Sequence, residues 1–281
     1  MYIKPTVDVK NKQGGNRVGE KKFLLEEEFE ALLNSNAITL DSSEPVMIYL
    51  SGCAFLSISK HLDKPYDSLF YNAMQSTLLT LCKSPSLHSC VFGYTAGNTI
   101  AIILSTKPNA SPWLGYDVHK MCSVAASIAT MAFYQSFSAA YNKLHDSDKA
   151  QYMGLVNRPM NFEAVSVNVP VERAADMIYW MQRYRNRHAV QELGRCFFAG
   201  RELKGLSNGA ILSLLKETYQ VDFNAMPTVF KRGVACKRVM SEEGHSKWTI
   251  DDNTPFYDNP QAKRELNDIL SAIKELYHSN P

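Results

Sequence analysis

The chain of 281 residues is 45% hydrophobic, 21% charged and has a formal net charge of +2. This composition is sufficient for a sizeable core in one large or two small domains. The near-neutral charge excludes a protein that binds nucleic acid through a basic tail or an overall basic surface, so any basic region must be local. The six cysteines include no C-x-x-C pair, which argues against a zinc ribbon and favours buried free thiols in a reducing compartment.

The N-terminal part is predicted to lead into a buried strand. Residues 1–20 are polar and predict a flexible arm, and the apolar spacing within Leu24–Leu33 predicts a packing helix. Neither this region nor any later one contains an apolar run of membrane-spanning length, so we expect a soluble, cytoplasmic protein with no membrane partner. The apolar run Val46–Leu50 predicts a strand that ends in a tight turn at Ser51-Gly52.

A helix, a hairpin and a second helix are predicted next. Tyr66–Leu81 repeats apolar residues at helical spacing, with Asp67 near its start, where a carboxylate favours the helix dipole. Cys90–Leu104 is predicted to form a β-hairpin with a turn at residues 96–98. Val118–Leu144 is rich in small apolar residues and predicts a long helix packed closely on a sheet.

The following segment is predicted to complete the core. Residues 145–158 are polar and are interpreted as an insertion, and Phe162–Val169 alternates apolar and polar residues as a strand does. Arg173–Phe198 predicts a long helix that is basic in its middle, and Pro170 is suited to its first turn. The order strand, helix, strand, strand, helix, strand is typical of ferredoxin-like folds, the architecture of polymerase palms.

The remaining residues are predicted to be additions to this core. We expect residues 200–240 to form an accessory helical piece, residues 241–260 to be looped, and Ala262–Tyr277 to form a terminal helix. The predicted fold class is therefore α+β, with a βαββαβ palm core and helical additions.

A series of short motifs follows this predicted core in order. They read L-S-G-C-A-F at 50–55, K-P-Y-D at 64–67, G-Y-T-A-G-N-T at 93–99, Lys120 with Ser123, Ala126 and Ser127, F-E-A-V at 162–165, W-M-Q-R-Y-R-N-R-H at 180–188, L-G-R-C-F-F-A-G-R-E-L-K-G-L-S at 193–207 and M-P-T-V-F-K-R-G-V at 226–234.

This series resembles the tRNA-His guanylyltransferase family, whose members add nucleotides in the 3′-to-5′ direction. The resemblance covers about residues 45–240, and each motif alone is weak. It implies a palm domain at residues 21–240, followed by a polar loop and a C-terminal helix at 241–281. It also implies a homo-oligomer, and a reaction in which a tRNA 5′ end is activated with ATP and extended with GTP.

The resemblance fails at the residues that carry the family's chemistry. The family's patterns D-G-R and S-D-E supply three carboxylates to two metal ions, and the corresponding positions here are Ser51, Asn98 and Thr99. Magnesium prefers anionic oxygen ligands, so we expect no Mg²⁺ at the usual two-metal site. The family pattern W-R-Q-x-D-A-x-R-N is also altered, with Tyr184 at the position of its aspartate.

Two sets of residues remain as binding candidates. The nucleotide candidates, for GTP or ATP, are Gly52, Cys53, Ala54 and Phe55, whose N–H groups could cradle phosphates, with Lys120 and Ser123, which match the family's triphosphate contacts. The RNA candidates are Arg183, Arg187, Lys204, Lys231 and Arg232, within a basic run that also includes Arg185, Arg195 and Arg201. A packing serine and solvated helix faces are the plain alternatives, and Trp113, Trp180 and Trp248 are interpreted as core or rim packing.

Three functions remain open from the sequence. The first is a family member that binds nucleotide, tRNA or another RNA, with 3′-5′ nucleotidyl transfer lost or impaired. The second is a non-catalytic structural or regulatory protein that reuses the palm to bind a protein partner. The third is an active nucleotidyltransferase with relocated ligands, for which Asp63, Asp117 and Glu163 are candidates, although the predicted strands place none of them beside Ser51 and Asn98.

Overall fold

The computed structural model describes residues 37–107, 110–158, 160–240 and 246–279, together with Glu27 and Ala31. The residues from Thr39 onward form one unit, and the elements below belong to it. The predicted flexible arm and the predicted packing helix within Leu24–Leu33 fall almost entirely outside the described residues.

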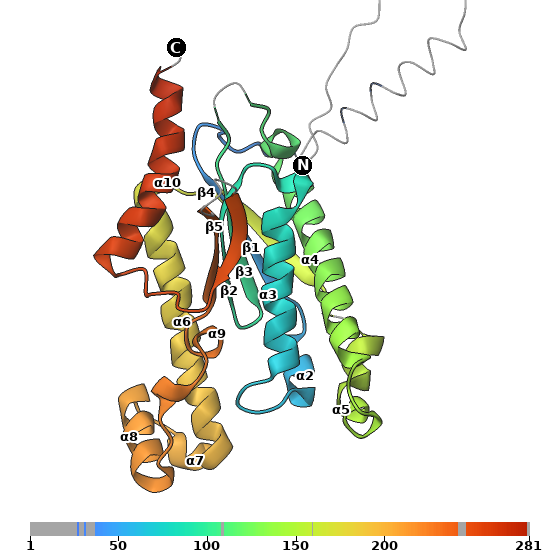
Figure 1. Cartoon of the computed structure of the whole chain (residues 1–281), viewed down its shortest axis with the longest axis vertical. Helices are drawn as coiled ribbons and strands as arrows, with labels where there is room; N and C mark the ends of the chain where they lie inside the picture. The colour runs from blue at the N-terminus through green and yellow to red at the C-terminus, as the bar shows by residue number, and fades with distance from the viewer. Residues whose placement is uncertain are drawn as a thin grey trace, which may run out of the picture. The chain divides into compact units, whose positions relative to one another are not determined.

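Strands and helices follow one another as Figure 1 shows. The strands are β1 Val46–Gly52, β2 Cys90–Ala96, β3 Thr99–Leu104, β4 Phe162–Asn168, β5 Val234–Met240 and β6 Ser246–Asp251. The α-helices are α2 Phe55–Ile58, α3 Ser68–Lys83, α4 Val118–Tyr141, α5 Asp146–Asn157, α6 Val171–Phe197, α7 Gly200–Leu203, α8 Asn208–Tyr219, α9 Thr228–Lys231 and α10 Pro260–Ser279. Short 3-10 turns lie at Ser59–His61, Pro85–Leu87, Trp113–Tyr116 and Phe223–Ala225.

The described strands form one antiparallel sheet in the order β4-β1-β3-β2-β5-β6. Its first four strands have the order and connections of a ferredoxin-like βαββαβ unit, so the predicted palm core is confirmed. The register pairs Ser51 of β1 with Thr99 of β3 and with Glu163 of β4. These three residues therefore lie in one row at the end of the sheet where β1 stops.

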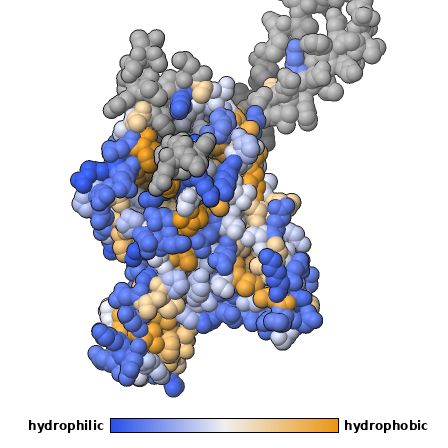
Figure 2. Space-filling view, in the orientation of Figure 1, coloured by the Kyte–Doolittle hydropathy of each residue, from blue (hydrophilic) through white to orange (hydrophobic). Residues whose placement is uncertain are grey.

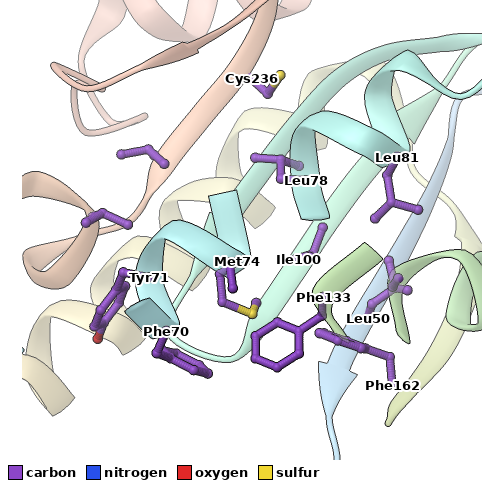
Figure 3. Close-up of a cluster of buried hydrophobic side chains, with 14 of the residues drawn as sticks. Leu50, Phe70, Tyr71, Met74, Leu78, Leu81, Ile100, Phe133, Phe162 and Cys236 are labelled. Carbon is purple, nitrogen blue, oxygen red and sulfur yellow. The ribbon is translucent and has the colours of Figure 1, made fainter. Parts of the chain in front are cut away.

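Helices cover both faces of the sheet (Figure 1). Because side chains alternate along a strand, Val46, Ile48 and Leu50 of β1 join the core beneath α3 and α4, while Met47 joins the core beneath α6 and α10. Figure 3 shows the first core, in which Phe70, Tyr71, Met74, Leu78 and Leu81 from α3 lie over Leu50 and Ile100, beside Phe133 and Phe162. The sheet is therefore held between two apolar layers.

Side-chain caps define where the helices that connect the core strands begin. Asp67 accepts a hydrogen bond from the backbone N–H of Phe70 (2.9 Å), and Asp117 accepts one from that of Lys120 (3.0 Å). Such caps satisfy N–H groups that a helix start leaves unpaired. Asp67 is buried and also accepts hydrogen bonds from the Asp63 N–H and the Tyr152 hydroxyl, each at 2.9 Å. The predicted role of Asp67 at the start of α3 is confirmed.

Three segments differ from their predicted structure. Residues 145–158 contain α5, which buries Tyr152 and Leu155 and is therefore more than a polar insertion. The end of the accessory segment 200–240 is the strand β5, and part of the segment 241–260 is the edge strand β6. β6 was missed because only Trp248 among its side chains is buried, which leaves a polar sequence typical of an edge strand.

The surface in the view of Figure 2 is largely hydrophilic, and hydrophobic residues gather on it in separate patches. In the part of the chain that the structure describes, none of the helices has the length and apolar character needed to cross a membrane.

Candidate functional site

A cavity of about 590 Å³ lies at the end of the sheet where the β2–β3 turn projects. Its walls come from the turn, from the segment between α2 and α3, and from the middle of α6. Its lining includes Tyr49, Phe55, Asp63, Lys64, Asp67, Gly97, Asn98, Thr99, Trp180, Tyr184, Arg185, His188, Glu192 and Arg195.

The structure brings the three neutral positions of the metal motifs together at this end of the sheet. The Gly52 N–H donates to the Asn98 carbonyl (2.9 Å), and the Asn98 side-chain amide donates back to the Gly52 carbonyl (3.0 Å). The Thr99 hydroxyl donates to the Ala96 carbonyl (2.8 Å). Of the groups that replace the family's carboxylates, Asn98 therefore holds β1 against the hairpin turn, and Thr99 closes the turn itself.

A buried guanidinium lies directly behind this turn. A side-chain carbon added at Gly97 would lie 3.5 Å from Arg185 Cδ and Nη1. Arg185 donates through Nε to the Phe230 carbonyl (2.8 Å) and through Nη1 and Nη2 to Glu192 (3.2 and 2.6 Å). Burial opposes its charge, but Tyr71 and Glu192 raise the pKa of Arg185 above its ordinary value, so it remains cationic. The family pattern has alanine at this position.

These residues do not fit the two metal ions that the family resemblance implies. Magnesium sites are built from hard, mostly anionic oxygens, whereas Ser51, Asn98 and Thr99 are neutral and a cation stands behind the turn. Among the described residues, no group of three or more His, Cys, Asp or Glu side chains could hold a metal ion.

One of the three candidate replacement carboxylates lies closer than the sequence interpretation placed it. Glu163 is exposed and is the cross-strand partner of Ser51, so the expectation that none lies beside Ser51 is wrong for Glu163. Asp63 instead accepts a hydrogen bond from Gln151 (2.9 Å), and Asp117 caps α4 near the opposite end of the sheet. Glu163 alone, as the carboxylate paired with Ser51 across the strands, is too few for a pair of divalent ions at the metal positions.

The predicted nucleotide-binding residues separate into two groups. Gly52 and Cys53 use their N–H groups within the fold, since Cys53 N–H donates to the Asn161 carbonyl (2.8 Å), so these groups do not form the expected phosphate cradle. Ala54 follows with a positive φ of 55° and leads into α2, where Phe55 reaches the cavity wall and packs on Phe70 at 5.3 Å between ring centroids.

Lys120 and Ser123 lie elsewhere. Both belong to the first turns of α4, which follows the Leu104 end of β3 after the segment 105–117, whereas the cavity adjoins Thr99 at the other end. Five residues of strand separate these ends by about 17 Å. Lys120 pairs with Asp117 at 3.7 Å, and the Ser123 hydroxyl donates to the Lys120 carbonyl (3.1 Å). The structure therefore does not bring them together with Gly52–Phe55.

The basic residues that were candidates for RNA binding fall into two groups, those bonded within the fold and those exposed. Arg185 is buried and does not belong to an RNA-facing surface, because its guanidinium is used within the core. Lys231 donates to the Asn224 carbonyl, and Arg232 donates to the Thr254 carbonyl (2.9 Å) and stacks on Phe256. The run's remaining basic residues are exposed: Arg183, Arg187, Arg195, Arg201 and Lys204.

A second, more open cavity adjoins the first. Its volume is about 510 Å³, and it lies between the C-terminal part of α6 and the α7 region. Among the described residues, its lining contains Arg195, Arg201 and Lys204 and no acidic residue, and Arg195 also lines the first cavity.

The sequence interpretation missed a column of aromatic rings on α6. Trp180 and Tyr184 are 61% and 55% exposed, and with His188 they line the first cavity. The Trp180 and Tyr184 rings stack at 5.7 Å between centroids, and Tyr184 and His188 lie 4.3 Å apart. Their spacing of four residues, which places side chains on one helix face, was the available signal. The packing roles of Trp113 and Trp248 are confirmed by their burial.

Comparison with known proteins identifies relatives of this fold. The sequence profile described as tRNAHis guanylyltransferase matches residues 27–170, slightly more than half of the chain. A comparison with curated proteins finds no match.

Several solved structures resemble this chain over most of their own length. A bacterial tRNA(His) guanylyltransferase (Thg1)-like protein in complex with ATP is 19% identical, with a TM-score of 0.75, over 88% of this chain and 99% of that one. A second structure with the same description, in complex with GTP, is 18% identical, with a TM-score of 0.69, over 88% of this chain and 99% of that one. The tRNA(His) guanylyltransferase of Saccharomyces cerevisiae is 13% identical, with a TM-score of 0.61, over 79% of this chain and 96% of that one. At these identities the likeness establishes the fold.

Proposed function

Because the chain belongs to the tRNA-His guanylyltransferase family, we propose that it binds a nucleoside triphosphate, ATP or GTP, in the 590 Å³ cavity and does not carry out metal-dependent 3′-5′ nucleotidyl transfer. It is a nucleotide-binding member of the family whose ligand recognition does not depend on divalent ions.

One observation carries this proposal: the side chains at the three metal positions are neutral, and two of them are already hydrogen-bonded within the fold. Asn98 and Thr99 are held by the Gly52 and Ala96 carbonyls, and Arg185 stands behind the turn. Two-metal catalysis needs ions that stabilise the attacking and leaving oxygens of the phosphoryl transfer. Without anionic ligands these ions are not retained at this position, while the cavity beside it remains open.

Nucleotide binding is supported by the shape and chemistry of that cavity. Its volume falls within the range of small-molecule sites, and its walls combine aromatic rings with a few charged groups, as such sites do. ATP and GTP occupy the bacterial structures of the same fold. Two of the cations among its lining residues, Lys64 and Arg195, are suited to phosphate oxygens.

Calorimetry tests the binding part of the proposal. The full chain is titrated with ATP and with GTP, once with Mg²⁺ and once with a chelator. We expect binding in both conditions with dissociation constants that agree within about threefold, because no protein carboxylate pair links the nucleotide to a metal. Absence of heat for both nucleotides would contradict nucleotide binding and favour the protein-interaction alternative.

A guanylate-addition assay tests the catalytic part. The wild-type chain is incubated with tRNA, ATP, GTP and Mg²⁺ or Mn²⁺, and we expect no extended product. If extension occurs and Glu163→Gln abolishes it, the alternative of relocated ligands is correct, because Glu163 is the carboxylate opposite Ser51. Lys83→Ala, an exposed substitution outside both cavities, serves as the control for the assay.

A further inference from the structure

The exposed column Trp180, Tyr184 and His188 is an unusual feature for the surface of a helix. Large aromatic side chains are seldom left in water in a contiguous group unless they meet a partner. Each of these rings lines the first cavity, and the two ring pairs are 5.7 and 4.3 Å apart between centroids. Nucleobases stack on such rings whatever their sequence, because every base has a π-face.

The charges beside the column are distributed unequally between the two cavities. The first cavity has the cations Lys64, Arg185 and Arg195 and the carboxylates Asp63, Asp67 and Glu192, so its basic groups are balanced by acidic ones. The second cavity has Arg195, Arg201 and Lys204 without an acidic lining residue. The aromatic wall is therefore suited to bases, and the second cavity to phosphates.

The basic residues of the second cavity are available to a ligand. Arg195, Arg201 and Lys204 are exposed, and none of them forms an ion pair within the described part of the chain. Trp180 and Arg195 are fifteen residues apart on the same helix, α6, which corresponds to about 22 Å along its axis. This length accommodates a strand of several nucleotides at a stacked spacing of about 3.4 Å.

From this arrangement we propose that α6 and α7 bind a single-stranded RNA segment of several nucleotides, with its bases stacked on Trp180, Tyr184 and His188 and its phosphates in the basic cavity of Arg195, Arg201 and Lys204. The inference rests on the proposed function, since the first base of the RNA strand occupies the cavity assigned to a nucleotide. The new ligand class is an extended strand of RNA. The residues of the second cavity distinguish such a strand from a mononucleotide.

Fluorescence anisotropy of a labelled oligoribonucleotide of eight adenylates tests the proposal with the full chain. We expect Trp180→Ala to weaken binding by about tenfold or more, the effect of losing one base–aromatic stack, and Trp180→Phe to restore most of it. Tyr134→Ala, which removes an exposed tyrosine on α4 outside both cavities, should leave the affinity unchanged. Circular dichroism verifies that each variant is folded.

The salt dependence separates phosphate contacts from general effects. If the protein neutralises three phosphates of a bound single strand, a plot of log affinity against log salt concentration has a slope of roughly −2. Arg201→Ala and Lys204→Ala should each reduce the magnitude of this slope by about 0.7. Lys83→Ala, on α3, should not change the slope.

The outcomes distinguish this inference from the proposed function. ATP or GTP binding measured by calorimetry, together with no oligoribonucleotide binding or with binding unaffected by Trp180→Ala, overturns the strand proposal and leaves the nucleotide proposal standing. Oligoribonucleotide binding without mononucleotide binding supports the strand and overturns the nucleotide proposal. A self-association that Trp180→Ala abolishes, seen by sedimentation, overturns the strand proposal by showing that a second copy covers the rings.

Discussion

At the residue scale, the site is organised by a cation where the family pattern has alanine. Arg185 is 7% exposed and joins three groups: the Phe230 carbonyl, the Glu192 carboxylate and the turn at Gly97. Removing one partner of such a pair leaves the other charge without compensation, which costs more than the pair itself contributes. The chain therefore depends on Arg185 for the shape of the cavity, whether or not a ligand is bound.

Arg185→Ala should lower the free energy of unfolding by about 3 kcal/mol, because the partly buried Glu192 carboxylate and the Phe230 carbonyl both lose their buried partner. Urea denaturation of the purified variant measures this change. Lys149→Ala is the matched control, since it removes a pair of comparable 2.9 Å separation whose carboxylate, on Asp146, is 98% exposed, and it should leave the stability almost unchanged. Equal losses for the two variants would show that burial of the Arg185 pair is unimportant.

His188 gives the site a dependence on pH. Partial burial, together with Arg185, Arg187 and Arg195, lowers the pKa of His188 below its ordinary value of 6.5 despite the opposing Glu192. The ring is neutral in the folded protein at pH 7, and its contribution to stability is present above pH 6.5 and is lost as the pH falls through the lowered pKa.

The negative phosphates of a bound oligoribonucleotide favour the protonated imidazole and so raise the pKa of His188. By linkage, the affinity for the oligoribonucleotide should increase as the pH is lowered from about 7.5 to 5.5. NMR titration of the imidazole, with and without the oligoribonucleotide, measures both effects. In His188→Gln this pH dependence should disappear; if it persists, another group is responsible.

At the element scale, β5 depends on a glycine for its junction with β2. Gly233 has a φ of +79°, and an added side-chain carbon would lie 2.4 Å from the Thr95 carbonyl oxygen and from the Tyr94 hydroxyl. The Tyr94 hydroxyl donates to the neighbouring Arg232 carbonyl. The strand β5 can therefore pair with β2 closely only because position 233 lacks a side chain.

Gly233→Ala should lower the free energy of unfolding by about 3 kcal/mol or more, since backbone strain and a steric clash act together. Gly205→Ala isolates the backbone effect, because Gly205 has a similar φ of +81° with no atom within 4 Å of the added carbon. This control should lose about 1 kcal/mol. Denaturation midpoints that agree for the two variants would mean that β2 and β5 adjust around the new side chain.

At the scale of the whole molecule, the palm could be predicted because its elements follow local rules. Val46–Leu50, the hairpin around Gly97 and the caps at Asp67 and Asp117 are specified by residues close in sequence. β6 could not be predicted, because an edge strand buries too little to produce a pattern. In the site, the pairing of Ser51 with Thr99 could be predicted, because the motifs place both residues at the family's metal positions.

The rest of the site depends on long-range geometry. Arg185 was grouped with its charged neighbours, although it is buried behind the turn at Gly97. Glu163 was placed away from Ser51 because the register between β1 and β4 is set by the whole sheet. Trp180 was interpreted as packing, since a single sequence does not show which face of α6 the additional strands and helices leave uncovered.

The position of Arg195 in the walls of both cavities has a thermodynamic consequence. A ligand in the first cavity that binds this guanidinium changes the affinity of the second cavity for its own ligand. Such energetic coupling is reciprocal, so the factor by which the first occupant alters the second equals the factor in the opposite direction. Because both occupants draw on this one guanidinium, filling one cavity is expected to weaken binding in the other.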